Sequence, residues 1–210
     1  TIRMLLGLAS ATGGEIRMLG GTMPAAGRAV LPRVGALVEG PAFYPFLSGR
    51  DNLRRLDAAD RHTSTATREH RVDAALDRVG LGHAARKRAH AYSLGMKQRL
   101  GIANALLAPR ELLILDEPSN GLDPQGTREV RHLIRSLADE GTTIFLSSHL
   151  LAEVEQTCTH AVVGNKGRIV ASGPVEEIVG ESPSVQVDVS DVPAATRVLE
   201  ELGVRSVKAE

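Results

Sequence analysis

The sequence predicts an α/β fold, with a mostly parallel sheet and helices on both of its faces. Apolar runs alternate along the chain with stretches of helical periodicity, which favours α/β over all-α and all-β architectures. Residues 112–117 read LLILDE, a nearly continuous aliphatic run that is typical of a parallel strand covered on both faces. Pro124 suits the first turn of a helix and Gly141 its end, so the segment between them is expected to be helical.

The first half of the chain is expected to hold three helices and two strands. Ser48 or Asp51 can cap the second helix, and the polar segment 62–67 separates it from the third, which stops at Gly80. The expected helices are 1–8, 48–61 and 68–80, and the expected strands are 15–19 and 33–39.

The second half continues the same alternation. Asn165-Lys166-Gly167 is suited to a hairpin turn between two short strands. The expected helices are 94–107, 124–140 and 150–158, and the expected strands are 112–117, 142–148, 160–165 and 167–173. Residues 181–210 then read as strand, helix and strand.

Composition argues against several classes of protein. Lys and Arg total 25, as do Asp and Glu, so the chain has no net positive charge that would attract it to nucleic acid. The single cysteine, Cys158, excludes an internal disulfide framework and fits a reducing compartment. No signal peptide is visible, and no apolar run approaches the ~20 residues of a membrane span. We therefore expect a cytosolic domain.

Two adjacent acids end the LLILDE strand. Asp116 and Glu117 fall at the carboxyl edge of the sheet, where α/β folds bind ligands, and they point to opposite faces. One can orient Mg²⁺, which prefers oxygen ligands, and the other can poise a water for attack on phosphorus. The alternative is a strand end with two solvated acids.

Two further segments add to this motif. Ser93 stands at a helix start, followed by Leu94, Gly95 and Met96, and a helix N-terminus suits an anionic phosphate. An ordinary serine N-cap is the alternative at Ser93. His149 follows a buried strand and can reach the same sheet edge, where an imidazole could contact a γ-phosphate or the attacking water.

These segments, in this order, resemble the nucleotide-binding subunits of ABC transporters. The carrying sequences are YSLGMKQR, LLILDEPSNGLD and FLSSHLLAEVE, and the resemblance covers roughly residues 1–180. It implies a P-loop NTPase-like ABC ATPase core that binds ATP and Mg²⁺. It also implies two partners, a second ATP-binding subunit and an integral membrane permease that would hold the protein at the inner face of the membrane.

The resemblance assigns roles to the candidate residues. Asp116 would hold the Mg²⁺ shell, Glu117 would polarise the attacking water, and His149 would contact the γ-phosphate. The signature segment, Ser93 to Met96, would close over a nucleotide held by the opposite subunit. Asp123 would lie at the interface between the two ATP-binding subunits.

Three departures from the family pattern stand out. Glu39 occupies the place where the family usually has Gln; it can still bind a metal or its water. Leu94 and Met96 replace the more usual Gly and Gln of the signature, as in the antibiotic-resistance and ABC-2 exporter branch. The phosphate loop G-x-x-x-x-G-K-[ST] is absent, because none of the four lysines follows a glycine. We expect that loop upstream of Thr1, and we expect the 210 residues alone to bind ATP poorly.

The resemblance also predicts the domain organisation. Residues 1–180 would be the ATPase domain, with a helical subdomain at about 50–92, and residues 181–210 would begin an accessory region with a partial βαβ pattern. Phe43, Tyr44 and Phe46 lie in one loop, which is either a local minicore or a partner-docking surface.

The predicted function is ATP hydrolysis by a transporter subunit, in an exporter of a drug, antibiotic or lipid-like substrate. Two alternatives remain. One is a non-transport ABC ATPase, which would show duplicated cassettes or a coiled-coil insertion, and the other is a truncated remnant that cannot turn over ATP.

Overall fold

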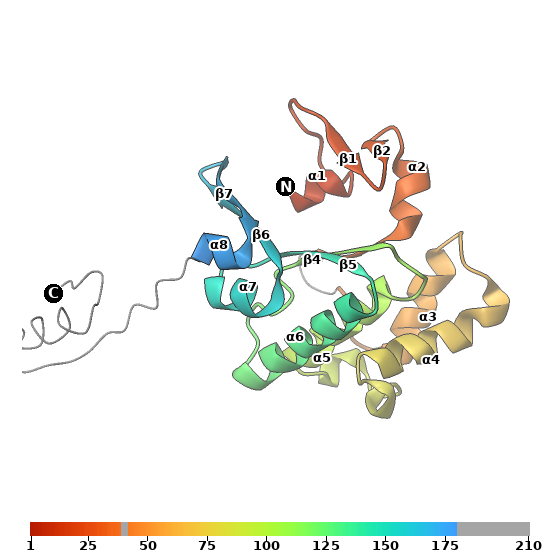
Figure 1. Ribbon diagram of the computed structural model, residues 1–210. Helices are drawn as coiled ribbons and strands as arrows, with labels where there is room; N and C mark the ends of the chain where they lie inside the picture. The colour runs from red at the N-terminus through yellow and green to blue at the C-terminus, as the bar shows by residue number, and fades with distance from the viewer. Residues whose placement is uncertain (39–41, 180–210) are drawn as a thin grey trace, which may run out of the picture. The chain divides into compact units, whose positions relative to one another are not determined.

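The structure is a computed structural model that describes residues 1–38 and 42–179 (Figure 1). Contacts divide the chain into two compact units, the first running from Thr1 to Thr159 and the second beginning at His160. Glu39 and the expected accessory region 181–210 lie outside the described residues.

The first unit is built on a three-stranded parallel sheet. Its strands are β3 (Val34–Leu37), β4 (Leu112–Asp116) and β5 (Thr143–Ser147), in the order β3-β4-β5. Asp116 lies opposite Ser147 in the register of β4 and β5. Since parallel strands point the same way, the segments that follow Asp116 and Ser147 leave from the same edge of the sheet.

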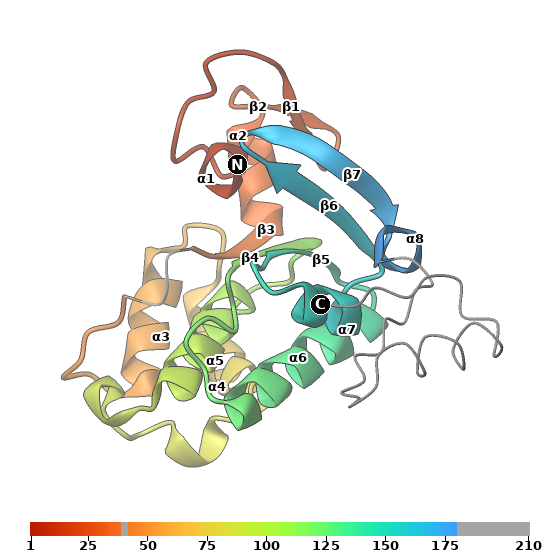
Figure 2. The same ribbon diagram turned by 90° about the vertical axis from the view of Figure 1, so that its left-hand side faces the viewer.

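Helices cover both faces of this sheet, as the sequence predicts (Figures 1 and 2). Leu113 and Leu115 point to one face, where they join a core formed with α5 (Leu94–Ala105) and α6 (Pro124–Asp139). Ile114 points to the other face and packs with a smaller cluster. That cluster is supplied by α1 (Ile2–Leu5), β1 (Ile16–Met18), β2 (Gly21–Met23), α2 (Gly27–Val30) and Val34.

Residues 49–91, which precede α5, are mostly helical. They form α3 (Gly49–Ala59), α4 (Arg68–Arg78) and the short 3-10 turns η2 (Thr65–Thr67), η3 (Gly82–Ala84) and η4 (Ala89–Ala91). Of the two capping residues expected for α3, Ser48 is the N-cap, since its side chain accepts a hydrogen bond from the Asp51 backbone N–H at 3.0 Å. Both helices pack on α5 through the main core.

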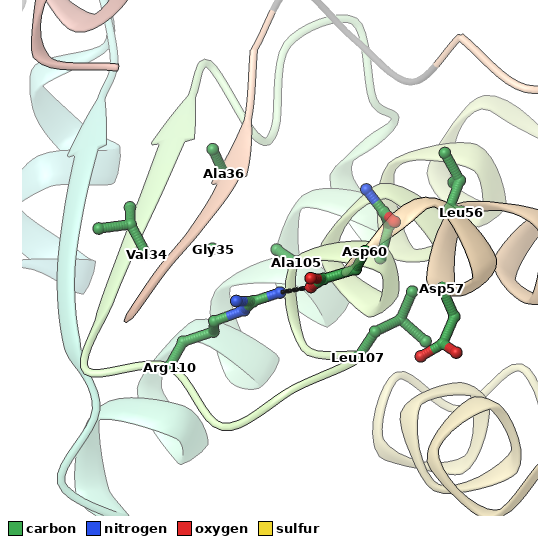
Figure 3. A pocket seen from close by; sticks show the side chains of 10 residues that line it. Val34, Gly35, Ala36, Leu56, Asp57, Asp60, Ala105, Leu107 and Arg110 are labelled. Carbon is green, nitrogen blue, oxygen red and sulfur yellow. Dashed lines mark hydrogen bonds and ion pairs between the residues drawn. The ribbon is translucent and has the colours of Figure 1, made fainter. Parts of the chain in front are cut away.

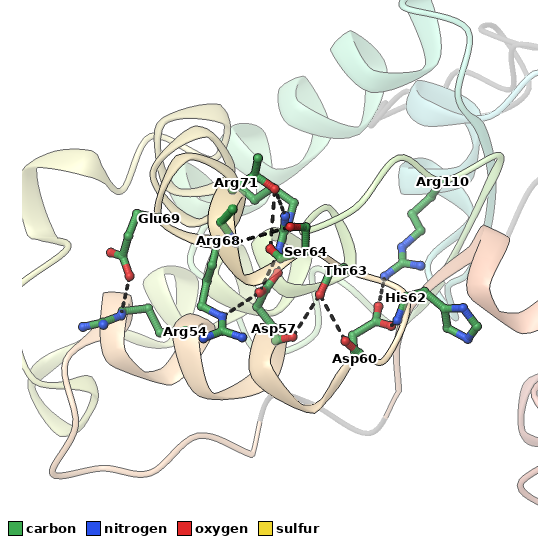
Figure 4. Close-up of polar contacts among 12 residues, drawn as sticks. Arg54, Asp57, Asp60, His62, Thr63, Ser64, Arg68, Glu69, Arg71 and Arg110 are labelled. Atoms are coloured by element: carbon green, nitrogen blue, oxygen red, sulfur yellow. Dashed lines mark hydrogen bonds and ion pairs between the residues drawn. The ribbon is translucent and has the colours of Figure 1, made fainter.

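A buried carboxylate ties α3 to α4 (Figure 4). The Asp57 side chain is fully buried, and Arg68 and Arg71 each donate to it, from Nε of Arg68 at 2.9 Å and from Nη2 of Arg71 at 2.7 Å. Burial alone would raise the pKa of Asp57, but the two guanidinium groups outweigh it and hold that pKa below its ordinary value. The pair of helices is therefore joined by a desolvated ionic network.

The described part of the second unit is a hairpin followed by a short helix. Strands β6 (His160–Asn165) and β7 (Arg168–Pro174) are antiparallel, and α8 (Val175–Val179) follows them. Lys166 and Gly167 form the turn with φ of 46° and 78°, and positive φ at both central residues is the mark of a type I′ hairpin. The expected hairpin is confirmed.

Element boundaries differ from the expected ones mainly near the N-terminus. The helix expected at 1–8 is the single turn α1, and β2, α2 and the 3-10 turn η1 (Leu31–Arg33) were not predicted. The last helix of the first unit, α7 (Leu151–Thr157), lies within its expected range. Among the described residues, no helix is long and apolar enough to cross a membrane.

Candidate functional site

Asp116 and Glu117 lie where β4 ends, and both are partly buried. The hydroxyl of Ser147, at the end of β5, donates to Asp116 Oδ1 at 2.6 Å and accepts from the Glu117 backbone N–H at 3.0 Å. Ser147 thus fixes the carboxylate of one acid and the peptide of the next. Asp116 and Glu117 therefore end the strand with defined hydrogen bonds while staying partly exposed to solvent.

His149 reaches the same place from the loop after β5. Its Nδ1 lies 2.8 Å from Glu117 Oε2. The imidazole is 61% exposed and the Glu117 side chain 34% exposed, so both groups are open to a ligand. The structure therefore brings Asp116, Glu117 and His149 together at one edge of the sheet.

The backbone of Glu117 is unusual. Its φ is +48°, in the left-handed region that residues other than glycine seldom occupy. Such conformations cost free energy and cluster at active sites, where the surrounding structure holds them. Here the bond from the Glu117 N–H to Ser147 and one from the Asn120 N–H to the Glu117 carbonyl hold the turn.

Ser93 is the N-cap of α5, and its hydroxyl accepts a hydrogen bond from the Met96 backbone N–H at 3.2 Å. Ser93 therefore acts as a helix N-cap, as the alternative interpretation predicts. This role does not exclude contact with a phosphate, because Ser93 and Leu94 are exposed and the helix N-terminus faces solvent. Gly95 and Met96 are partly buried behind them.

Asp123 caps the neighbouring helix α6, accepting from the Gly126 N–H at 2.7 Å. The two helix starts lie against each other. A Cβ built on Gly121 would be 3.2 Å from the Leu94 side chain, and one on Gly95 would be 3.8 Å from that of Leu122. The signature segment and Asp123 therefore share one exposed region of the first unit.

The donor set at the sheet edge suits Mg²⁺. Asp116 and Ser147 offer oxygen atoms, and no group of three or more His, Cys, Asp or Glu side chains forms a metal cage among the described residues. Mg²⁺ commonly binds one or two carboxylates and takes its other ligands from water and substrate phosphates. The residues present fit that pattern, with Asp116 as the carboxylate.

A cavity lies elsewhere in the first unit (Figure 3). It has a volume of about 130 Å³ and is lined by residues of β3, α3 and α5 together with Asp60, Leu107 and Arg110. Asp60 and Arg110 form an ion pair at 3.4 Å. None of Asp116, Glu117 and His149 lines this cavity. The candidate site lies at an exposed edge of the sheet, where the His149 side chain is mostly exposed and the Glu117 side chain partly so.

Comparison with known proteins identifies the family. A family model described as ABC transporter matches residues 1–120. A bacitracin transport ATP-binding protein of Bacillus licheniformis is 45% identical over 179 residues, which are 85% of this chain and 57% of that protein.

The chain belongs to the ABC transporter family. A bacitracin transport ATP-binding protein of Enterococcus faecalis is 41% identical over 201 residues, 95% of this chain and 64% of that protein. The chain thus spans less than two thirds of the length of these relatives. Among solved structures, cbiO1 from Clostridium perfringens, part of the ABC transporter complex cbiONQ, matches with a TM-score of 0.75 and 25% identity, covering 97% of this chain and 77% of that one. The fold is that of an ABC ATPase subunit.

The loop before α3 carries three aromatic side chains, Phe43, Tyr44 and Phe46. Phe43 packs against the main core, whereas Tyr44 and Phe46 are 43% and 64% exposed and make an edge-to-face pair with centroids 5.8 Å apart. The Arg55 guanidinium lies 4.5 Å from the centre of the Tyr44 ring. The loop is therefore part minicore and part exposed aromatic surface.

Two residues near the site, Ser147 and Glu153, were missed by sequence reasoning. Glu153, in the first turn of α7, accepts hydrogen bonds from Ser119 and Ser148, which flank the two candidate catalytic side chains. An acid three residues into the helix after His149 was visible in the sequence. Its two partners were not, because they meet only in the folded chain.

Proposed function

We propose that the full-length protein is the ATP-hydrolysing subunit of an ABC exporter, with a peptide antibiotic, drug or lipid-like molecule as its substrate. The observation that carries the proposal is the contact between His149 and Glu117 beside Asp116, at the carboxyl edge of a parallel sheet. The exporter branch is supported by the similarity to two bacitracin transport proteins.

Each residue has a distinct part in the proposed reaction. The Glu117 carboxylate accepts a hydrogen bond from the water that attacks the γ-phosphorus. His149 contacts the γ-phosphate and orients it relative to this water. Asp116 would hold Mg²⁺ or a water of its shell, and Ser147 fixes the orientation of the Asp116 carboxylate. When bound, Mg²⁺ neutralises phosphate charge. Glu39 lies outside the described residues, and its part in binding metal or nucleotide stays a prediction.

The exposed start of α5 is proposed to serve a second subunit. Ser93, Leu94, Gly95 and Met96 would cover a nucleotide bound to the partner copy, with Asp123 beside the subunit interface. Backbone N–H groups at a helix start suit a phosphate, and the exposure of Ser93 and Leu94 leaves them available. The exposed rings of Tyr44 and Phe46 are the proposed docking surface for the membrane permease, which would hold the protein at the inner face of the membrane.

Purified full-length protein tests the activity. We expect phosphate release from ATP that requires Mg²⁺, and dimer formation with ATP when hydrolysis is blocked. The 210-residue chain alone, which lacks the pattern G-x-x-x-x-G-K-[ST], should show neither. Failure of the full-length protein to hydrolyse ATP would contradict the proposal, as would micromolar ATP binding by the 210 residues in calorimetry.

Expression with the permease tests the transport role. Cells that carry both proteins should tolerate a higher bacitracin concentration than cells with the permease and the Glu117→Gln variant. Equal tolerance, at equal protein levels and with ATPase activity established, would reject bacitracin as a substrate and leave the ATPase assignment standing.

A further inference from the structure

A single carboxylate oxygen joins the two loops that carry the candidate catalytic residues. Oε2 of Glu153 accepts a hydrogen bond from Ser119 Oγ at 2.5 Å and another from Ser148 Oγ at 3.2 Å. Ser119 is two residues after Glu117, and Ser148 is one residue before His149. Glu153 therefore spans the two segments whose side chains meet at 2.8 Å.

The catalytic pair needs such a link. The His149 ring is mostly exposed, so packing does little to fix it, and Glu117 sits in a left-handed backbone conformation that must be held by its surroundings. At the strand ends, Ser147 already fixes the Asp116–Glu117 side. One oxygen of the partly buried Glu153 accepts from both hydroxyls, so this side chain can fix the remaining distance between the loops.

We propose that Glu153 is a positioning residue that holds His149 against Glu117 through Ser119 and Ser148. The inference rests on the proposed ATPase function and adds a residue to its machinery. Glu153 does not reach the reacting atoms, and it acts by keeping two loops in one geometry. Small displacements of catalytic groups cost up to about 100-fold in rate, so turnover should depend on it.

A structural alternative must be separated from this role. An acid in the first turn of a helix also stabilises that helix through the macrodipole. That effect depends on charge, whereas the bridge depends on an acceptor oxygen. Glutamine keeps such an oxygen, which can accept from both hydroxyls, but carries no charge.

The test compares variants of the full-length protein in steady-state ATP hydrolysis. Glu153→Ala should lower kcat about 10- to 100-fold with KM for ATP unchanged, while Glu153→Gln should stay within about threefold of the wild type. Ser119→Ala with Ser148→Ala should lower kcat as Glu153→Ala does, and adding Glu153→Ala to that pair should cost nothing more. Glu155→Ala, an exposed acid on the same helix, is the matched control and should have no effect.

Three results would overturn the proposal. They are an unchanged kcat in Glu153→Ala, equal losses in Glu153→Ala and Glu153→Gln, and additive losses from the serine and glutamate changes. If Glu153→Ala fails to fold, the serine pair and Glu153→Gln decide the matter. A wild-type protein without ATP hydrolysis refutes the proposed function itself, whereas an active wild type with an equally active Glu153→Ala refutes only the bridge.

Discussion

His149 Nδ1 lies 2.8 Å from Glu117 Oε2, although the two residues leave different strands. The contact follows from the sheet, because β4 and β5 are parallel neighbours and place Asp116 opposite Ser147. One residue beyond Asp116 is Glu117, and two beyond Ser147 is His149. A carboxylate and an imidazole in contact at an exposed edge are groups that can hydrogen-bond a water or a phosphate oxygen, which is the basis of the proposed roles.

Glu117→Gln tests the carboxylate. Glutamine keeps the size and can still accept from the imidazole, but it cannot act as a base, so turnover in the full-length protein should fall at least about 100-fold. ATP binding and ATP-dependent dimerisation should remain, measured by calorimetry and by size-exclusion chromatography. Glu155→Gln should leave turnover unchanged. Retained turnover in Glu117→Gln would reject Glu117 as the base.

Substitutions at Ser93 separate its capping role from its proposed contact with a partner's nucleotide. Ser93→Ala removes the bond to the Met96 N–H and should destabilise the protein by about 1 kcal/mol. Ser93→Asp keeps a good cap, so unfolding in urea should match the wild type, yet it places a negative charge where a phosphate is proposed to lie. Turnover and ATP-dependent dimerisation should therefore be lost in Ser93→Asp. Normal turnover there would leave Ser93 as a cap alone.

Sequence patterns predicted the central sheet well because its strands carry strong local signals. LLILDE is apolar on both faces, and the structure buries Leu113 and Leu115 on one face and Ile114 on the other. By contrast, β2 and α2 are three and four residues long. Segments this short show no recognisable hydrophobic periodicity. The conformation of β2 and α2 is determined by packing around Met23 and Val30.

Only part of the candidate site could be predicted from the sequence. Asp116, Glu117 and His149 could be placed from sequence, since strand ends in a parallel sheet meet at one edge. The contacts of Ser147 and Glu153 could not, because each depends on register and loop geometry across about 30 residues of chain. Asp57 stands on the helix expected at 48–61, but its ion pairs with Arg68 and Arg71 form only in the folded chain.

Gly35 should tolerate no larger side chain. A Cβ at this position would lie 2.5 Å from the Ala105 carbonyl oxygen and 2.6 Å from Leu113 Cδ2, both in the main core. Because β3 and α5 would have to separate, Gly35→Ala should destabilise the protein by about 1–3 kcal/mol, measured by urea unfolding. Gly13→Ala is the matched control, since a Cβ there meets nothing within 4 Å. Equal stability of the two variants would show that β3 and α5 are not packed this closely.

Asp57→Asn should be the most destabilising of these changes, and its effect should depend on pH. Losing the carboxylate leaves Arg68 and Arg71 near a fully buried position without their charge partner, which costs about 3–5 kcal/mol. The pKa of Asp57 is lowered in the folded state, so its contribution is present above the unfolded value, about 3.9, and is lost as the pH falls through the folded value. The difference in unfolding free energy between wild type and Asp57→Asn should therefore be largest near pH 7 and shrink below about pH 4.

Asp73→Asn is the control, because its half-exposed ion pair with Arg50 should contribute under about 1 kcal/mol. Urea titrations of the three proteins at several pH values measure this, and a difference that stays constant into acid would show that the Asp57 carboxylate is not the source of the stability.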